Sequence, residues 1–357
     1  MADSVARQRH PDPVQAGGFL LLACQSGAEP TLAASALEAL PAAARGAWRR
    51  GFVTLKQSAL PATLPDLPFA RAVINCYGQV QGESPATLAA AAAARARAAW
   101  QAIHVWPRVP AVECDVPAIT TALAAACGMT SEPRPPRPGD LVLDCLVDAA
   151  DRWWVGWHRA TTPATCWPGG IYPRILPAGK VSRAWLKLDE ALATFEVPLA
   201  RGQRALELGA APGGACQRLL EAGLHVTGVD PAVIDPRVAS HDRFTHWRLR
   251  ARDVRLKACR GFDWIVTDMN IDPTSVMAAL ERIVTAPQVR LRGIVATLKL
   301  PEWSRAAGLA GWLDRIRDWG YQPRARQLST GGREVCVVAL RGRGVSRRRA
   351  ATPPPAA

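Results

Sequence analysis

The stretch that restricts the fold most is ALELGAAPGGACQRLL at residues 205–220, where an apolar strand runs into a glycine-rich turn and then a helix. Such a turn brings the backbone close to a ligand at the helix N-terminus, beside the carboxyl end of the strand. The spacing is G-x-x-x-G-G rather than G-x-G-x-x-G, and Pro212 removes an N–H group that a pyrophosphate would use. The turn therefore favours a nucleoside ligand without phosphates over a dinucleotide.

From residue 182 onward, strand-like and helix-like segments alternate. The pattern predicts a doubly wound, Rossmann-like α/β domain whose last two strands form an antiparallel hairpin. The expected strands are 204–208, 225–229, 244–249, 263–267, 292–298, 322–328 and 334–340, and the expected helices are 183–194, 214–222, 274–285 and 303–318.

The N-terminal part is expected to form α+β structure. Ser84 caps one helix and Pro85 fits its first turn. The aromatic WWVGW at 153–157 is typical either of a packed strand pair or of a surface on which bases stack. Apolar runs predict strands at 19–23, 51–55, 69–76, 141–146 and 153–157, and helices are expected at 32–40, 84–103 and 117–127.

Charge is distributed unevenly along the 357 residues. Residues 1–170 carry 14 basic and 13 acidic side chains, a balance of +1, whereas residues 171–357 carry 30 and 17, a balance of +13. This favours a polyanion such as RNA as partner, although an arginine-rich composition from a GC-rich genome gives the same bias. The chain has no long apolar run and no signal-like N-terminus, so we expect a cytoplasmic protein, with neither membrane nor DNA as a partner.

Nine cysteines and six histidines are scattered along the chain, without a Cys-x-x-Cys or His-x-x-x-His pair. An odd number of cysteines without paired spacing argues against a disulfide framework and against a zinc ribbon. We expect free thiols and no metal site.

Carboxylates follow the strands around the glycine turn. Asp230 ends the second strand of the domain, where a carboxylate can accept both ribose hydroxyls, and Asp253 follows the third, where one can accept from an adenine amino group. Together with the turn they outline a site for S-adenosylmethionine; alternatively, both are loop carboxylates without a ligand. The candidate cofactor-binding residues are Glu207, Gly209, Ala210, Pro212, Gly213, Gly214, Asp230, Asp253 and Asp268.

Five motifs occur in order: SRAWLKLDE at 182–190, LGAAPGG at 208–214, VTDM at 266–269, ATLKLP at 296–301 and REV at 333–335. Through them residues 180–341 resemble the FtsJ-like RNA ribose 2′-O-methyltransferases, most of all the members that modify 23S ribosomal RNA of the large subunit. The resemblance implies S-adenosylmethionine as cofactor and a cytidine of that RNA as target. It also implies an N-terminal RNA-binding region made of a ferredoxin-like and a THUMP-like domain.

The expected organisation combines these segments. It runs from a disordered tail (1–16) through a ferredoxin-like domain (17–80), a THUMP-like domain (81–170) and the methyltransferase domain (171–342) to a basic, proline-rich tail (343–357).

The catalytic tetrad of the family carries over by motif to Lys187, Asp268, Lys299 and Glu334. A ribose 2′-hydroxyl is a poor nucleophile and needs a base. Lys299 would be that base, with its pKa brought down by burial and by the second ammonium, that of Lys187. Asp268 would orient Lys299 and hold the hydroxyl, and Glu334 would position Lys187 or the ribose.

Three features depart from the family pattern. Glu207 stands where the family usually has Asp, Ala215 replaces an aromatic residue, and Asn270 with Asp272 follows TDM in place of the pattern of the single-domain members. These changes bear on cofactor affinity rather than on the catalytic groups.

Two other functional classes remain open. A base methyltransferase acting on an amino nitrogen usually ends a strand with Asn/Asp-Pro-Pro-aromatic, where this chain has TDMN at 267–270. A non-catalytic RNA-binding protein of the same fold, acting in ribosome assembly, would be expected to have lost part of the tetrad. The glycine spacing disfavours a nicotinamide dehydrogenase.

Overall fold

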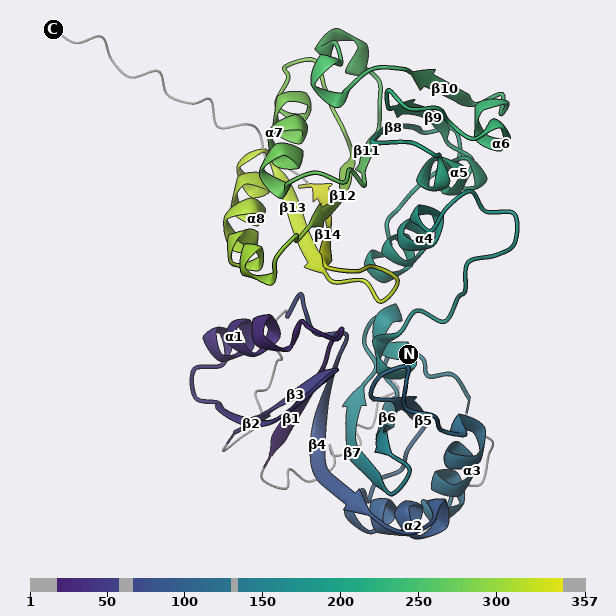
Figure 1. The fold of residues 1–357 in the computed structure, drawn as a ribbon, viewed down its shortest axis with the longest axis vertical. Helices are drawn as coiled ribbons and strands as arrows, with labels where there is room; N and C mark the ends of the chain where they lie inside the picture. Colours follow the sequence, from purple (N-terminus) through teal and green to yellow (C-terminus); the bar gives the residue numbers. More distant parts are fainter. Residues whose placement is uncertain (1–17, 58–66, 130–133, 343–357) are drawn as a thin grey trace, which may run out of the picture. The chain divides into compact units, whose positions relative to one another are not determined.

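Two seven-stranded sheets organise the protein (Figure 1). The computed structural model describes residues 18–57, 67–129 and 134–342, so the tails expected at 1–16 and 343–357 lie outside the described residues. The chain divides into two compact units, Met1–Ile171 and Tyr172–Ala357. Within the described ranges, no helix combines the length and the apolar character that crossing a bilayer requires.

One mixed sheet, in the order β2-β3-β1-β4-β7-β6-β5, holds the first unit together. The β5–β6 pair is parallel and the other pairs are antiparallel. The elements are β1 (Phe19–Ala23), α1 (Glu29–Ala39), β2 (Ala44–Arg49), β3 (Phe52–Lys56), β4 (Ala72–Gln81), α2 (Pro85–Arg95), β5 (Ala102–Pro107), α3 (Val116–Ala126), β6 (Leu141–Ala149), β7 (Arg152–Arg159) and two short 3-10 helices, η1 (Pro163–Cys166) and η2 (Pro168–Gly170).

Strand β4 joins the two halves of this sheet, because it pairs with β1 on one side and with β7 on the other. The boundary expected between residues 80 and 81 falls inside this strand, so the two N-terminal domains expected there share one sheet. In β7, Trp153 and Trp157 are buried in a core with residues of α2 and α3. The packed-strand interpretation of WWVGW is thereby confirmed for these two side chains.

The prediction of one helix over 84–103 is wrong for the second half of that range. The helix begins as predicted, since the Ser84 hydroxyl accepts from the Thr87 N–H, but α2 ends at Arg95 and β5 begins at Ala102. Trp100 is buried, and its indole N–H donates to the carbonyl of Ala96. Burial of this ring and parallel pairing of β5 with β6 outweigh the helix propensity of the alanine run.

Strands β2 and β4 differ from those predicted from the sequence. All six residues of β2 are exposed, so the strand carries no apolar alternation that could reveal it. The strand expected at 69–76 begins later, at Ala72, and continues to Gln81, where its second half pairs with β7. The extension of β4 comes from a pairing partner far away in the sequence, whereas β2 pairs with the neighbouring strand β3 and is hidden by its exposed residues.

The second unit has the strand order β10-β9-β8-β11-β12-β14-β13. The first five strands are parallel, and β14 runs antiparallel to both β12 and β13, which confirms the doubly wound domain with a terminal hairpin. Figure 1 shows α4 and α5 on one side of the sheet and α7 and α8 on the other. The elements are α4 (Ala184–Phe195), β8 (Arg204–Leu208), α5 (Gly214–Glu221), β9 (His225–Val229), α6 (Pro236–Ala239), β10 (Phe244–Trp247), η3 (Ala251–Asp253), η4 (Leu256–Cys259), β11 (Trp264–Thr267), α7 (Pro273–Val284), β12 (Gly293–Lys299), η5 (Trp303–Gly308), α8 (Leu309–Asp318), β13 (Tyr321–Arg326) and β14 (Glu334–Arg341).

Candidate active site

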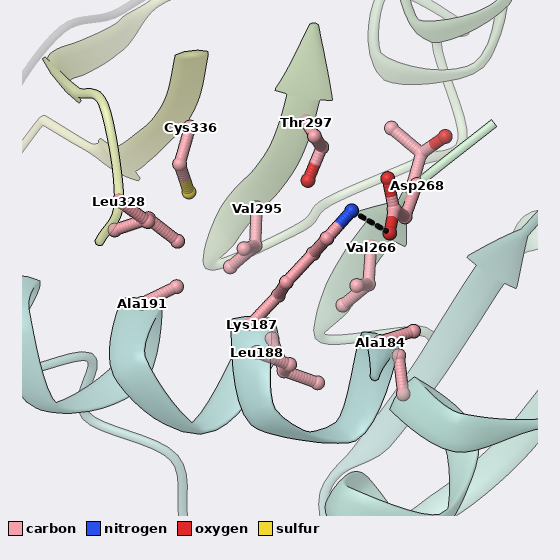
Figure 2. Close-up of a pocket in the computed structure, with 12 residues that line it drawn as sticks. Ala184, Lys187, Leu188, Ala191, Val266, Asp268, Val295, Thr297, Leu328 and Cys336 are labelled. Carbon is pink, nitrogen blue, oxygen red and sulfur yellow. Dashed lines mark hydrogen bonds and ion pairs between the residues drawn. The ribbon is translucent and has the colours of Figure 1, made fainter. Parts of the chain in front are cut away.

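One edge of the second sheet brings the four candidate catalytic residues together. Asp268 directly follows β11, Lys299 is the last residue of β12, and Glu334, the first residue of β14, is paired with Lys299. Because β11 and β12 are parallel neighbours, their carboxyl ends meet at this edge. Lys187 reaches the same point from α4, as Figure 2 shows.

The four side chains form a ring in which each ammonium contacts both carboxylates. Lys299 Nζ lies 2.6 Å from Asp268 Oδ1 and 2.5 Å from Glu334 Oε2. Lys187 Nζ lies 3.3 Å from Asp268 Oδ2 and 2.8 Å from Glu334 Oε1. The side chains are between 9% and 18% exposed. Two positive and two negative charges cancel, which allows the ring to lie in a mostly buried place.

The carboxylates set the protonation state of Lys299. Burial alone would lower its pKa, but the charges and hydrogen bonds of Asp268 and Glu334 outweigh burial and raise the pKa above its ordinary value of 10.5. The pKa of Glu334 is correspondingly lowered, because the two lysines outweigh the effect of its burial. The expectation that Lys299 has a lowered pKa is therefore wrong for this arrangement. Lys299 is an ammonium at neutral pH.

A small pocket adjoins the ring (Figure 2). Lys187 and Asp268 supply its charged groups, most of its other lining side chains are short or apolar, and the space is large enough only for a water-sized molecule. Ala215, the position where an aromatic residue is usual in the resembling family, contributes to this lining. The remaining lining residues are Ala184, Leu188, Ala191, Val266, Thr267, Val295, Thr297, Leu328 and Cys336.

The glycine turn after β8 packs tightly against the same edge. Gly209 has a φ of 78°, and a Cβ there would lie 2.6 Å from Met269 Cγ, so only glycine fits. Gly213, with a φ of 117°, precedes the first residue of α5. Asp230 ties the turn to the end of β9, since its carboxylate accepts from the N–H groups of Ala211 (3.1 Å) and Ala232 (2.8 Å). Its remaining lone pairs are available to a ligand.

Glu207 of β8 is a buried acid with an unused oxygen. The residue is 1% exposed, and its Oε2 atom has no hydrogen-bond partner among the described residues. Burial raises the pKa of its carboxyl to about 8, against the weaker opposing effect of a hydrogen bond with Cys216. An unpartnered carboxyl oxygen beside a glycine turn suits a ligand that brings a cationic group, as S-adenosylmethionine does.

We expect the Glu207→Gln variant to be more stable than the wild type at alkaline pH and equally stable near pH 5. In the unfolded chain this carboxyl loses its proton near 4.5, whereas the folded protein holds it until about pH 8. Unfolding between these values releases a proton, so the free energy of unfolding of the wild type falls as pH rises. Above pH 8, the free energy of unfolding of Glu207→Gln should exceed that of the wild type by on the order of a few kcal/mol.

Thermal melts at pH 5 and 8.5, followed in the wild type and the variant, measure this difference. Glu196→Gln, which changes an exposed carboxyl just after α4, is the matched control and should show no such dependence. If the melting temperatures of variant and wild type differ by the same amount at both pH values, the raised pKa of the Glu207 carboxyl is contradicted.

The other candidate cofactor residues are placed unequally. Ala210 is buried, the Pro212 carbonyl accepts from the Asp235 N–H, and Gly214 begins α5. Asp253 lies in η3 with a side chain 57% exposed, and its ion pair is with Arg252, at 3.8 Å. Among the described residues, no hydrogen bond or ion pair joins Asp253 to the turn. The structure thus brings the turn and Asp230 together but leaves Asp253 at the surface.

Three residues near the site are not among those predicted from the sequence. Val233 and Ile271 are exposed apolar side chains on the loops after β9 and β11, at the same sheet edge as the ring. Glu190, which is 2% exposed on α4, accepts from the N–H groups of Ser329 (2.7 Å) and Thr330 (2.8 Å). It thereby fixes the loop that leads into Glu334. Its i,i+3 spacing from Lys187 on one helix is the pattern that points to it.

Comparison with known proteins agrees with this geometry. Residues 180–301 match the family model described as FtsJ-like methyltransferase. The chain is 30% identical to ribosomal RNA large subunit methyltransferase M of Xanthomonas oryzae pv. oryzae, over 90% of this chain and 99% of that protein. It is 30% identical to the protein of the same name from Halorhodospira halophila, over 90% of this chain and 96% of that protein.

A solved structure, TrmN from Thermus thermophilus, is 15% identical with a TM-score of 0.34, covering 91% of this chain and 99% of that one. The sequence relatives, which extend over nearly the whole chain, carry the assignment. The chain is an S-adenosylmethionine-dependent methyltransferase and belongs to the family of ribosomal RNA large subunit methyltransferase M, among the FtsJ-like methyltransferases.

Proposed function

We propose that this enzyme methylates the 2′-oxygen of a ribose in 23S ribosomal RNA, at a cytidine, with S-adenosylmethionine as methyl donor. The observation that carries the proposal is the ring of Lys187, Asp268, Lys299 and Glu334 beside a pocket and a glycine turn. A sugar hydroxyl needs a proton acceptor and a group that orients it, and the ring offers both. The relatives are named for large-subunit ribosomal RNA, and this name supports the same class of substrate here.

The residues of the glycine turn, with Glu207 and Asp230, would hold the cofactor. When bound, S-adenosylmethionine supplies an electrophilic methyl group on a positively charged sulfonium. In the proposed reaction the neutral amine of Lys299 accepts the one proton of the ribose 2′-hydroxyl as its oxygen takes the methyl group, and Asp268 holds Lys299 Nζ in position for this transfer. Lys187 neutralises Asp268 and Glu334, so that both carboxylates keep their positions when the proton moves.

Lys299 accepts a proton only as a neutral amine, and the two carboxylates oppose that form. Two changes on substrate binding work in the other direction. RNA docking excludes water from the ammonium, and this loss of solvent lowers the pKa of Lys299. A positive charge brought by the cofactor acts in the same sense. The neutral fraction of Lys299 is therefore larger in the assembled complex than in the free enzyme, although the ammonium remains the major form at neutral pH.

The first unit is proposed to capture RNA, in keeping with the ferredoxin-like and THUMP-like domains expected there. Its edge strand β2, ARGAWR, is exposed throughout and carries Arg45, Trp48 and Arg49. Trp48 is 47% exposed, which is unusual for so large an apolar ring. Arginines beside an exposed aromatic ring are the combination that binds phosphates and stacks on unpaired bases.

We expect Trp48→Ala to weaken binding of 23S RNA fragments by about 5- to 100-fold, because loss of one stacked base costs roughly 1–3 kcal/mol. Affinity for S-adenosylmethionine, whose candidate site lies in the second unit, should not change. Trp48→Phe keeps a stacking surface and is the matched control. RNA affinity that is equal in wild type and Trp48→Ala, measured by filter binding, would remove β2 from the RNA interface.

The test of the proposed activity uses S-adenosylmethionine with a labelled methyl group and 23S RNA transcribed without modifications. Label in an alkali-resistant dinucleotide, mapped to one position, is the expected result. A transcript with a 2′-deoxycytidine at the mapped position should accept none. Label in alkali-released mononucleotides would instead show base methylation. Cofactor binding without any transfer to this RNA would favour the alternative of a catalytically silent RNA-binding protein acting in ribosome assembly.

A further inference from the structure

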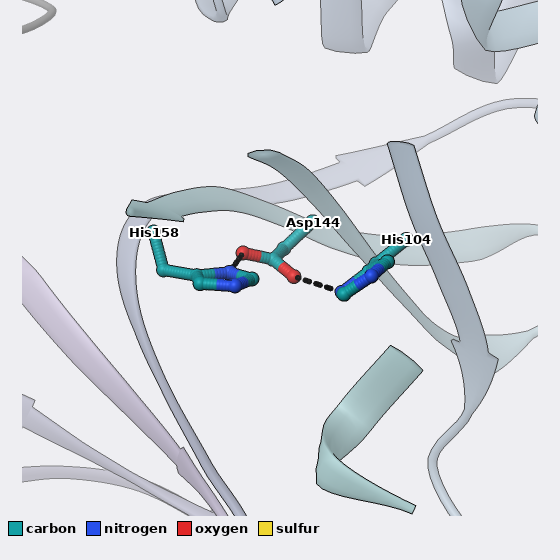
Figure 3. A group of neighbouring side chains, drawn as sticks. All are labelled: His104, Asp144 and His158. Carbon is teal, nitrogen blue, oxygen red and sulfur yellow. Dashed lines mark hydrogen bonds and ion pairs between the residues drawn. The ribbon is translucent and has the colours of Figure 1, made fainter. Parts of the chain in front are cut away.

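Three polar side chains lie side by side on one face of the first sheet, on the neighbouring strands β5, β6 and β7 (Figure 3). His104 pairs directly with Asp144, and His158 pairs with Val142, two residues before Asp144. Residues two apart on a strand share a face, so His104, Asp144 and His158 form one row across three strands. We call these three residues the His-Asp-His cluster.

The cluster is buried. His104 is 2% exposed, Asp144 1% and His158 9%. Their strand neighbours Ile103 and Val105 belong to the core with α2 and α3. The cluster therefore faces the opposite side, where Ala102, Val142 and Ala160 pack with Cys166 of η1. It lies far from the catalytic ring in sequence and within the other unit.

Asp144 and His158 are in close contact. His158 Nδ1 lies 2.5 Å from Asp144 Oδ2, and its Nε2 lies 2.8 Å from the carbonyl oxygen of Thr165. A carbonyl only accepts, so Nε2 carries a proton, and Nδ1 either carries a second proton toward Asp144 or presents a lone pair. A histidine whose far N–H donates to a backbone carbonyl is the usual arrangement of a metal ligand.

His104 decides between these alternatives. Neither of its ring nitrogens makes a hydrogen bond within the described residues, although Nδ1 lies 3.7 Å from Asp144 Oδ1. The ring is 2% exposed, and the neutral form of a buried imidazole presents one lone pair. A proton shared by Asp144 and His158 leaves this lone pair unused in a dry interior. A cation among the three side chains uses it.

We propose that His104, Asp144 and His158 bind one Zn²⁺ ion in the first unit. One nitrogen from each histidine and one carboxylate oxygen lie within 4.8 Å of one another. Two imidazoles and a carboxylate are a donor set that zinc accepts in tetrahedral geometry, with a fourth position for water. Zinc ligands lie about 3.3 Å apart when each bond is about 2.0 Å, so small side-chain rotations suffice. The ion would tie β5, β6 and β7 to η1 through the Thr165 carbonyl.

The experiment uses the full-length protein, purified without a metal-chelating column and with no histidine tag. Mass spectrometry of the metals should find about one zinc per chain. After removal of zinc by a chelator, Co²⁺ should bind in a 1:1 ratio, with the visible absorption of a tetrahedral site. Added Zn²⁺ should raise the melting temperature of the stripped protein. Less than a tenth of an equivalent of zinc, with no Co²⁺ absorption and no thermal shift, would overturn the proposal.

Variants locate the ion. His104→Gln keeps the size of the side chain and should reduce bound zinc at least tenfold, whereas His225→Ala, at an exposed position on β9, should leave it unchanged. Full zinc content in His104→Gln would overturn the proposal. A thiolate-to-cobalt charge-transfer band would also overturn the proposal, because it would show that the ion is bound by cysteines. The wild-type measurements decide the matter if His104→Gln fails to fold.

Discussion

Lys299→Ala is expected to reduce methyl transfer by at least about 10³-fold, because a positioned proton acceptor contributes roughly 10²–10⁴ to the rate. The substitution also removes the ammonium that lies 2.6 Å from Asp268 and 2.5 Å from Glu334. Affinity for S-adenosylmethionine should remain within a few-fold of the wild type, since Glu207 and Asp230 are untouched. Single-turnover transfer to 23S RNA and calorimetric titration with the cofactor measure the two quantities.

Lys299→Arg separates proton transfer from charge. Arginine keeps a cation between the two carboxylates but stays protonated at any usable pH, so it cannot accept the hydroxyl proton. We therefore expect Lys299→Arg to be as inactive as Lys299→Ala while melting closer to the wild type. Lys257→Ala, at an exposed lysine in η4, controls for general loss of positive charge. Near-normal transfer by Lys299→Arg would reduce Lys299 to an electrostatic role.

Asp268→Asn addresses the orienting group in the same assay. The amide keeps the shape of the side chain but loses the charge that holds both lysines. Transfer should fall by a comparable factor while the cofactor still binds. A parallel loss of cofactor affinity would place Asp268 in the cofactor site and outside the reaction.

The second unit follows from the sequence because its signals are local. Most of its strands are apolar runs, with β10 and β13 as more polar exceptions, and the alternation of strands with helices predicts the parallel part of the sheet. The rule that functional side chains gather at the carboxyl edge covers Asp268 and Lys299, whereas Lys187 and Glu334 are expected there only from the resemblance to the FtsJ-like family.

What could not be predicted depends on contacts between distant segments. The end of α2 at Arg95 is set by the pairing of β5 with residues 141–149. The His-Asp-His cluster has no spacing signal, because its members come from three separate strands. The predicted direction of the Lys299 pKa is wrong for another reason: the motifs bring two ammonium groups and two carboxylates together, but they do not show that both carboxylates contact Lys299 closely enough to outweigh its burial.

The rate of the chemical step should rise with pH across the whole neutral and mildly alkaline range. Asp268 and Glu334 raise the pKa of Lys299 above its ordinary value of 10.5, so only a small fraction is neutral at pH 7. Each added pH unit increases that fraction about tenfold as long as the pH stays below the pKa. Single-turnover rates between pH 6.5 and 9 should therefore increase by up to about tenfold per unit, without a plateau.

Glu334→Gln provides the internal comparison for this profile. Removing one of the two carboxylates that hold the ammonium lowers the pKa of Lys299, so the rising part of the profile should bend toward a plateau at lower pH than in the wild type. The glutamine keeps nearly the same shape beside Lys187. A wild-type profile that is flat from pH 6.5 upward would mean that Lys299 is already neutral in the assembled complex, or that another group takes the proton. An identical profile in wild type and Glu334→Gln would show that this carboxylate does not control the reacting lysine.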